Sequence, residues 1–170
     1  MLALAFEHKE ELQCRLRKIW ENEKYWYYNN SSYFRQLSLE EDTWNCMQYA
    51  SLNSAGEVIG YLEYGIERET RYVKYIAIAN FTDDASFGLD VLHMIKDIFE
   101  MYKYRKITFS VIIGNPIEKK YDKLISRYGG RIVGVYKENV MLPDGMLYDE
   151  KLYEIHRTDY LSHRKNVNNA

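Results

Sequence analysis

The sequence predicts an α/β fold in which helices flank one mixed β-sheet. Segments with apolar residues at every second position alternate with segments in which apolar residues recur every three or four positions. Several predicted strands are joined by short turn-forming sequences, which is typical of hairpins. In the middle of the chain, the order strand–helix–strand–helix–strand places strands 72–81 and 106–113 side by side and parallel. We therefore expect a sheet with a parallel centre and antiparallel flanks.

The N-terminal half is expected to contain strands that pair through hairpins. Residues 9–26 suit a helix, because apolar residues recur on one face from Leu12 onwards. The residues from Asn53 to Gly56 have the composition of a hairpin turn. Strand 72–81 has no charge between residues 75 and 79, which predicts burial on both faces. The elements expected here are strand 2–6, helix 9–26, a short helix at 33–37, and strands 44–53, 57–66 and 72–81.

The C-terminal half is expected to add two helices and three strands. Asn115 suits the N-cap of the second helix, with Pro116 at its first position. Gly129 and Gly130 would end that helix. A turn at Pro143-Asp144-Gly145 joins the last two strands. The elements expected here are helix 86–103, strand 106–113, a helix from Asn115 to the double glycine, and strands 131–141 and 147–157. We assign residues 1–160 to one domain and 161–170 to a polar tail.

The composition supports one domain with an unusual number of aromatic residues. The chain has 170 residues, 9 Gly and 2 Pro, whereas average usage would give about 20 Gly and Pro together. This leaves little sequence for flexible linkers. Tyrosine is unusually frequent, with 17 residues, and the aromatic residues are concentrated in the run 25–34. These side chains suit a core, a pocket or a partner surface.

Charge and targeting signals exclude several classes of protein. The net charge is −2, so there is no basic field of the kind that binds nucleic acid. The spacing of Cys14 and Cys46 does not suit a structural zinc site. The apolar N-terminal stretch is short, and no segment approaches the roughly 20 apolar residues of a membrane span. We expect a cytoplasmic protein without a nucleic-acid or membrane partner and without a bound metal.

The order of elements and two sequence segments resemble the GNAT superfamily of N-acetyltransferases. The segment from Asn115 to Val135 is similar to the family's strand–Asn–helix–Gly–strand sequence, and the segment from Asp144 to Arg157 to its closing hairpin. The resemblance lies within residues 56–160. With its Gly114-Asn115-Pro116 and Tyr128-Gly129-Gly130 sequences, the chain looks most like small members from Gram-positive bacteria and their phages. The resemblance implies that the central parallel pair splays into a V-shaped cleft.

The resemblance also implies acetyl-CoA as the cofactor. In the family, free backbone groups of the strand that corresponds to 72–81 hold the pantetheine arm. The following turn, residues 83–88, would give backbone N–H groups to the pyrophosphate at a helix N-terminus. The residues implied in cofactor binding are Ile76, Ala77, Ile78, Ser86, Phe87, Gly88 and Asn115.

The turn departs from the family pattern. Asp83 stands where the family has a basic or amide residue, Asp84 follows it, and Ser86 replaces a glycine. Two carboxylates would repel a pyrophosphate. The other interpretation is that Asp83, Asp84 or Ser86 caps the helix and favourably meets its positive end. Pantetheine binding could survive in either case, because it relies on backbone groups.

The candidate catalytic residues are two tyrosines and one glutamate. Many members of the family use a tyrosine as general acid for the leaving thiolate, and the family's spacing places Ile125 there, which cannot donate a proton. Tyr121 and Tyr128 lie about one turn to either side, and the alternative is that both belong to the buried stripe of their helix. Glu63 is a candidate general base, and the alternative is a surface carboxylate at a sheet edge.

Two functions follow from these residues. The first is an acyl-CoA-dependent N-acyltransferase that moves an acetyl group to a small amine or a protein amine. The second is a GNAT-like scaffold whose cofactor site has decayed and which binds a protein partner; its resemblance to small phage members of the family implies a phage-encoded protein. The aromatic run 25–34 would line the acceptor pocket in the first case and form an interface in the second. The sequence is also compatible with a homodimer.

Overall fold

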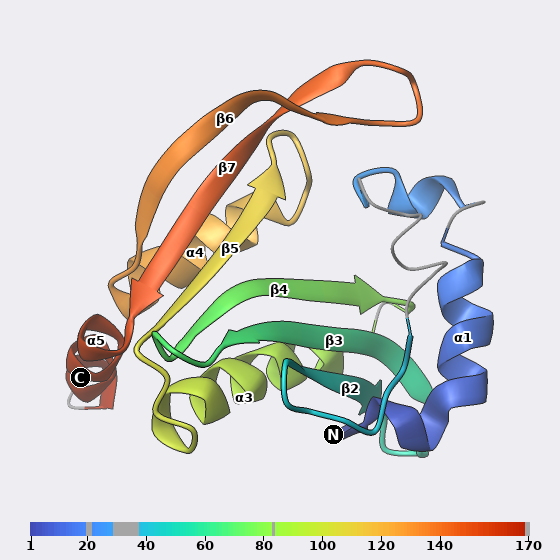
Figure 1. The fold of residues 1–170 in the computed structure, drawn as a ribbon, viewed down its shortest axis with the longest axis horizontal. Helices are drawn as coiled ribbons and strands as arrows, with labels where there is room; N and C mark the ends of the chain where they lie inside the picture. The colour runs from blue at the N-terminus through green and yellow to red at the C-terminus, as the bar shows by residue number, and fades with distance from the viewer. Residues whose placement is uncertain (20–21, 29–37, 83, 169–170) are drawn as a thin grey trace.

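The computed structural model describes residues 1–19, 22–28, 38–82 and 84–168, which form a seven-stranded mixed sheet with helices on both faces (Figure 1). The strand order is β1-β2-β3-β4-β5-β7-β6. The strands are β1 (Leu2–Leu4), β2 (Cys46–Leu52), β3 (Val58–Glu67), β4 (Tyr72–Asn80), β5 (Lys106–Ile112), β6 (Arg131–Met141) and β7 (Leu147–His156). The helices are η1 (Ala5–His8), α1 (Lys9–Arg17), η2 (Glu23–Tyr25), α3 (Ser86–Glu100), α4 (Glu118–Tyr128) and α5 (Arg157–Asn168).

The sheet divides into two arms between β4 and β5. These strands are parallel, as predicted, but their ladder contains one pair, Val73 with Ile107. Beyond that pair the strands diverge and form a V, with α5 near its closed end (Figure 1). Strands β1–β4 make the first arm and β5, β7 and β6 the second, and every neighbouring pair within an arm is antiparallel. The predicted mixed sheet with a splayed parallel pair is confirmed.

Each face of the sheet has its own core, because side chains of a strand alternate between the two faces. On one face, α3 packs Met94, Ile98 and Phe99 against the sheet. On the other, α1 packs Leu12 and Leu16 against the first arm. Side chains of β4 therefore pack with a different core on each face of the sheet, Ile76 and Ile78 on the α3 face and Ala77 on the α1 face.

Gly60 of β3 allows α3 to lie close to the sheet. A Cβ atom at this position would lie 2.2 Å from a Phe87 ring carbon and 2.9 Å from the Ala79 carbonyl oxygen. Because the ring is buried and the carbonyl belongs to the backbone, neither can move freely. We expect Gly60→Ala to lower the free energy of unfolding by about 2 kcal/mol, measured by urea denaturation. Gly134→Ala on β6, where no atom lies within 4 Å of the added Cβ, is the matched control, and equal midpoints for the two variants would contradict this account.

Two helical regions differ from the prediction. The helix expected at 9–26 ends at Arg17, and among the described residues 18–19 and 22–26 the segment Glu23–Tyr25 is helical again, as one 3-10 turn. The aromatic residues that follow contact two separate cores, which one straight helix could not reach. The structure also forms a helix over Arg157–Asn168, where a tail was expected from residue 161. Tyr160 anchors it, because its ring is buried and its hydroxyl donates a hydrogen bond to Glu100 at 2.9 Å. The short helix expected at 33–37 lies outside the described residues.

The centre of β4 is less buried than its charge-free sequence predicted. Residues 75–78 are half-buried rather than buried on both faces. The cause is the divergence of β5, which leaves the β5-facing side of β4 uncovered beyond Val73. An apolar strand whose edge is left open in this way is a surface for an apolar or amide-rich ligand.

Candidate functional site

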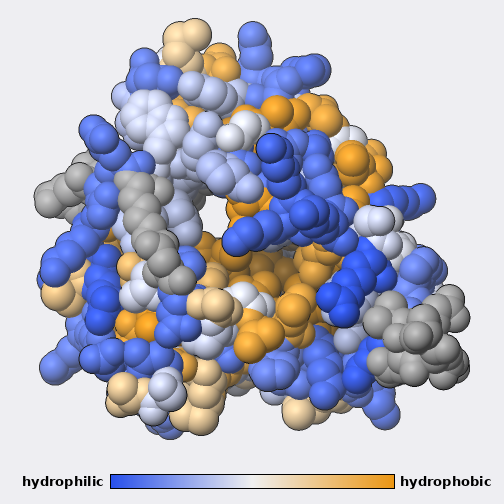
Figure 2. All heavy atoms as spheres, turned by 180° about the vertical axis from the view of Figure 1, so that it is seen from behind, coloured by the Kyte–Doolittle hydropathy of each residue, from blue (hydrophilic) through white to orange (hydrophobic). Residues whose placement is uncertain are grey.

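An apolar groove lies where the two arms diverge. From behind, the space-filling view shows a hollow at the gap, with hydrophobic atoms along its lower side (Figure 2). Its lining comes from β4, α3, β5 and α4, with Ile76, Ile78, Val91, Ile95, Phe109, Tyr121 and Leu124. Among the described residues of this lining, Tyr121 carries the one polar side-chain group, its hydroxyl. The groove therefore suits a narrow, mostly apolar ligand with a group that can form a hydrogen bond with one hydroxyl.

Two of the three β4 residues predicted to face the ligand line this groove. Ile76 and Ile78 contribute side chains to it, whereas Ala77 packs against the core on the α1 face. The alternation of side chains along a strand requires this division. Ala77 can contribute only backbone groups, and its backbone lies in the stretch of β4 that has no ladder to β5.

Tyr121 is the predicted general acid that the structure places in the groove. Its ring is held edge-on against Phe109, with centroids 5.0 Å apart, and against Tyr153 at 6.1 Å. Within the described part of the chain, its hydroxyl has no hydrogen-bond partner. Burial, with a smaller contribution from Tyr28, raises the pKa of Tyr121 well above its ordinary value. The hydroxyl therefore keeps its proton at neutral pH and can act as a proton donor.

Tyr128, the other predicted general acid, does not contribute to the groove. Its ring packs against Tyr160 of α5, with centroids 5.1 Å apart, and the Arg127 guanidinium lies over it. Ile125, which occupies the family's usual position, is buried against the core beside Gly130. The structure thus separates the two tyrosines that the sequence left equivalent.

Glu63 is buried in the first arm and is not a surface carboxylate, with 2% of its surface exposed. It accepts hydrogen bonds from the hydroxyls of Tyr61 and Tyr75 and from Nε2 of Gln48, the last at 3.3 Å. Glu63 lies opposite Ala77 in the β3–β4 ladder, and the Tyr61 ring packs with the α1-face core. The candidate acid and base therefore lie on opposite faces of the sheet.

An aromatic strap, residues 25–28, connects the two arms. Tyr25 is buried in the α1-face core, edge-on to Tyr28 at 5.3 Å between centroids. The Tyr28 hydroxyl accepts the backbone N–H of Asn80 at 3.4 Å, at the end of β4. Trp26 and Tyr27 instead pack against the second arm, in a small cluster with Ile112, Val140 and Leu142. These four aromatic side chains pack within the molecule, and the rest of the predicted patch, 29–34, lies outside the described residues.

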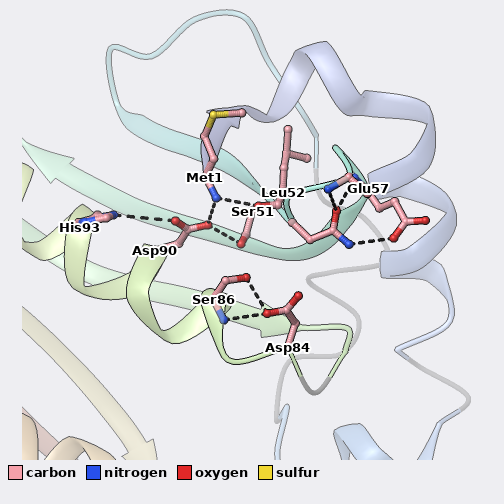
Figure 3. A network of polar contacts seen from close by, with 10 residues as sticks. Met1, Ser51, Leu52, Glu57, Asp84, Ser86, Asp90 and His93 are labelled. Carbon is pink, nitrogen blue, oxygen red and sulfur yellow. Dashed lines mark hydrogen bonds and ion pairs between the residues drawn. The ribbon is translucent and has the colours of Figure 1, made fainter.

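The turn before α3 is closed by its own hydrogen bonds (Figure 3). The Asp84 carboxylate accepts the Ser86 backbone N–H at 2.8 Å and the Ser86 hydroxyl at 2.7 Å. The N–H groups of Phe87 and Gly88 donate to the carbonyls of Asp84 and Ala85, at 3.3 and 3.2 Å. The hydrogen bonds from Ser86 lower the pKa of Asp84 below its ordinary value, so the carboxylate is ionised at neutral pH.

This turn does not fit a pyrophosphate. The N–H groups of the three predicted ligands, Ser86, Phe87 and Gly88, are already hydrogen bonded, and a carboxylate lies at the positive end of the helix. The Phe87 ring is part of the core, and only Gly88 faces open space. Asp84 accepts the first N–H of α3 from the position before the N-cap, which is Ala85, whereas Asp83 lies outside the described residues.

Asn115 and Asp90 have structural partners. Asn115 Oδ1 accepts the Ile117 N–H at 3.0 Å and so caps the turn that leads into α4, which begins at Glu118, two residues after the predicted first helical position, Pro116. Asp90, which the sequence did not single out, is buried on α3. It accepts hydrogen bonds from the Ser51 hydroxyl at 2.7 Å and the Met1 amino group at 2.8 Å, so it ties α3 to β1 and β2 (Figure 3).

The described residues also bear on membrane spans and metal sites. None of the helices there is both long and apolar enough to cross a membrane. No group of three or more His, Cys, Asp or Glu side chains in the same ranges could hold a metal ion.

Comparison with known proteins identifies the fold. No protein-family model and no curated protein sequence matches the chain. Among solved structures, it is similar to the spermidine/spermine N-acetyltransferase SpeG from Vibrio cholerae, with a TM-score of 0.60 and 18% identity over 71% of this chain and 70% of that one. A protein named as a probable acetyltransferase matches with a TM-score of 0.60 and 15% identity, over 76% and 75% of the two chains. The chain has the GNAT-like acetyltransferase fold.

Proposed function

We propose that this protein is an N-acyltransferase that moves an acetyl group from an acetyl thioester to an amine. The observation that carries the proposal is the apolar groove between β4 and β5, in whose described lining the Tyr121 hydroxyl is the one polar side-chain group. The fold it shares with acetyltransferase structures supports the same reaction class.

Acetyl-CoA is the proposed donor, held through its pantetheine arm. The side chains of Ile76 and Ile78 would contact the pantetheine chain. The backbone of β4 beyond Val73 would form hydrogen bonds with the pantetheine amides, in the way that a neighbouring strand would. The turn at Asp84 gives no comparable site to the phosphates. The groove alone would therefore provide most of the donor's binding energy.

The proposed chemistry is direct attack of a neutral amine on the thioester carbonyl. A carbon–nitrogen bond forms, the carbon–sulfur bond breaks, and the thiol leaves after it receives a proton. Backbone N–H groups of β4 would polarise the carbonyl, and Tyr121 would protonate the departing sulfur. The amine loses one proton in the same reaction.

Glu63 is the proposed acceptor of that proton, through a hydroxyl group. Its carboxylate is buried and bonded to Tyr61 and Tyr75, so substrate cannot reach it directly. Tyr75 is more exposed than Tyr61, and it is the better relay for this reason. We place the acceptor amine on the α1 face, beside the aromatic strap. SpeG, by its name, acetylates spermidine and spermine, so polyamines are the first small amines to test and lysine peptides represent protein amines.

The test is acceptor-dependent release of thiol from acetyl-CoA. Purified protein is mixed with acetyl-CoA and, in turn, spermidine, spermine and a lysine peptide, and free thiol is measured with a chromogenic reagent. We expect at least one amine to raise the rate above acetyl-CoA hydrolysis, with an acetylated product seen by mass spectrometry. No product with these amines, together with no heat of binding for millimolar acetyl-CoA, would contradict the proposal.

A second function is favoured by one observation, the closed turn at Asp84. A GNAT-like scaffold that has lost its donor site would bind a protein partner and no thioester. The same calorimetry separates the two functions, because this one requires that neither acetyl-CoA nor pantetheine binds.

A further inference from the structure

We propose that Asp84 makes the protein recognise its donor by the pantetheine arm and not by the phosphates, so that CoA binds no more tightly than pantetheine itself. This inference rests on the proposed function, since it concerns the donor of the same reaction. It follows from three features of the turn and the groove.

The first feature is that Asp84 occupies the position an anion would take. A helix N-terminus attracts anions because its first N–H groups lack partners within the helix. At the start of α3, the Ser86 N–H and hydroxyl both donate to Asp84 Oδ1, at 2.8 and 2.7 Å. A phosphate could take these donors only by displacing the carboxylate.

The second feature is that the cations near the turn are already paired with other carboxylates. The Met1 amino group, whose charge acts on Asp84, donates a hydrogen bond to Asp90 at 2.8 Å. Arg15 comes near, with its guanidinium 5.9 Å from the centroid of Phe81, the residue that follows β4. However, that guanidinium donates two hydrogen bonds to Glu11, at 3.0 and 2.9 Å. An incoming phosphate would meet the Asp84 charge without a free arginine to offset it.

The third feature is that none of the described side chains that line the groove is charged. Its lining is apolar apart from Tyr121, and the adjoining stretch of β4 offers backbone groups. A neutral chain with two amides, such as pantetheine, meets both kinds of surface. Recognition is therefore concentrated in the part of the donor that carries the thioester.

The test compares two ligands on matched variants. CoA and pantetheine are titrated by calorimetry into the wild-type protein and into Asp84→Asn, which keeps an acceptor for the Ser86 N–H and removes the charge. For the wild type we expect dissociation constants within about threefold of each other. Asp84→Asn should lower the dissociation constant of CoA about fivefold or more, because it removes one negative charge near the phosphates. The dissociation constant of pantetheine should stay unchanged. Asp84→Ser, with a hydroxyl cap, should do the same.

Asp144→Asn is the control. Asp144 also accepts a backbone N–H two residues ahead, from Met146 at 2.9 Å, but it lies in the β6–β7 turn. It should change neither ligand's affinity. Wild-type CoA binding more than about 30-fold tighter than pantetheine binding, or unchanged CoA affinity in both Asp84 variants, would overturn the inference and leave the proposed function intact. If neither ligand binds to any of these proteins, the proposed function fails and this inference with it.

Discussion

Replacing Tyr121 with phenylalanine is expected to lower kcat about 100-fold without unfolding the protein. A positioned general acid contributes roughly 10²–10⁴-fold to such a reaction. The ring would keep its contacts with Phe109 and Tyr153, and no hydrogen bond between described residues would be lost. The measurement is thiol release at saturating acetyl-CoA, with the acceptor that the assay identifies.

Tyr128→Phe is the matched control, because it removes the same atom from the same helix at a site packed against Tyr160. Its kcat should stay within about twofold of the wild-type value.

Since the pKa of Tyr121 is raised, the ionisation of Tyr121 begins only at a pH above the ordinary range for tyrosine. Activity should therefore not fall through loss of this proton between pH 7 and pH 9. A Tyr121→Phe enzyme with full kcat would show that another group protonates the sulfur.

Replacing Glu63 with alanine is expected to lower the free energy of unfolding by about 3–5 kcal/mol. The substitution removes an acceptor that two tyrosine hydroxyls and the Gln48 amide share, and the Gln48 amide keeps its hydrogen bond to the Ser38 carbonyl at 3.0 Å. Loss of an acceptor from a buried hydrogen-bond network costs about 1–3 kcal/mol for each hydrogen bond removed. Urea denaturation followed by circular dichroism measures the effect.

Glu57→Ala serves as the comparison, because Glu57 is exposed and its side chain accepts a hydrogen bond from Asn53 in the β2–β3 turn. It should change stability by no more than about 0.5 kcal/mol. Glu63→Gln separates structure from chemistry, since it keeps the shape and an acceptor but cannot take a proton. Loss of kcat in a stable Glu63→Gln protein supports the proposed base, whereas a Glu63→Ala midpoint equal to that of Glu57→Ala would contradict the buried network.

Most of the fold could be predicted because its strands and helices have clear periods and turn residues. The bounds of β6 agree with the prediction to the residue, since Gly129-Gly130 precedes it and Pro143-Asp144-Gly145 follows it. The prediction failed where tertiary contacts outweighed local pattern. Residues 18–26 were assigned to a helix because Ile19 continued the apolar face, but the aromatic residues after it pack against two cores.

The site was predictable in outline and not in detail. The sequence placed Tyr121 and Tyr128 on one face of a helix. The structure distinguishes them because α5, a helix that was not predicted, packs Tyr160 against Tyr128. Glu63 was recognised as a candidate, but its partners Gln48, Tyr61 and Tyr75 come from three strands. A period-2 pattern shows which strand positions share a face, yet it cannot show how three strands align.

The single ladder pair between Val73 and Ile107 has a consequence for how the chain folds. Within each arm, β2–β3, β3–β4 and β6–β7 are hairpins joined by short connections, which are contacts of low sequence separation. Joining the arms brings together β4 and β5, which are separated along the chain by α3. Closing this longer loop costs more chain entropy than closing a hairpin. We therefore expect the three hairpins to become ordered before the two arms join. The gap that would hold the donor then takes its native shape after the hairpins on either side of it.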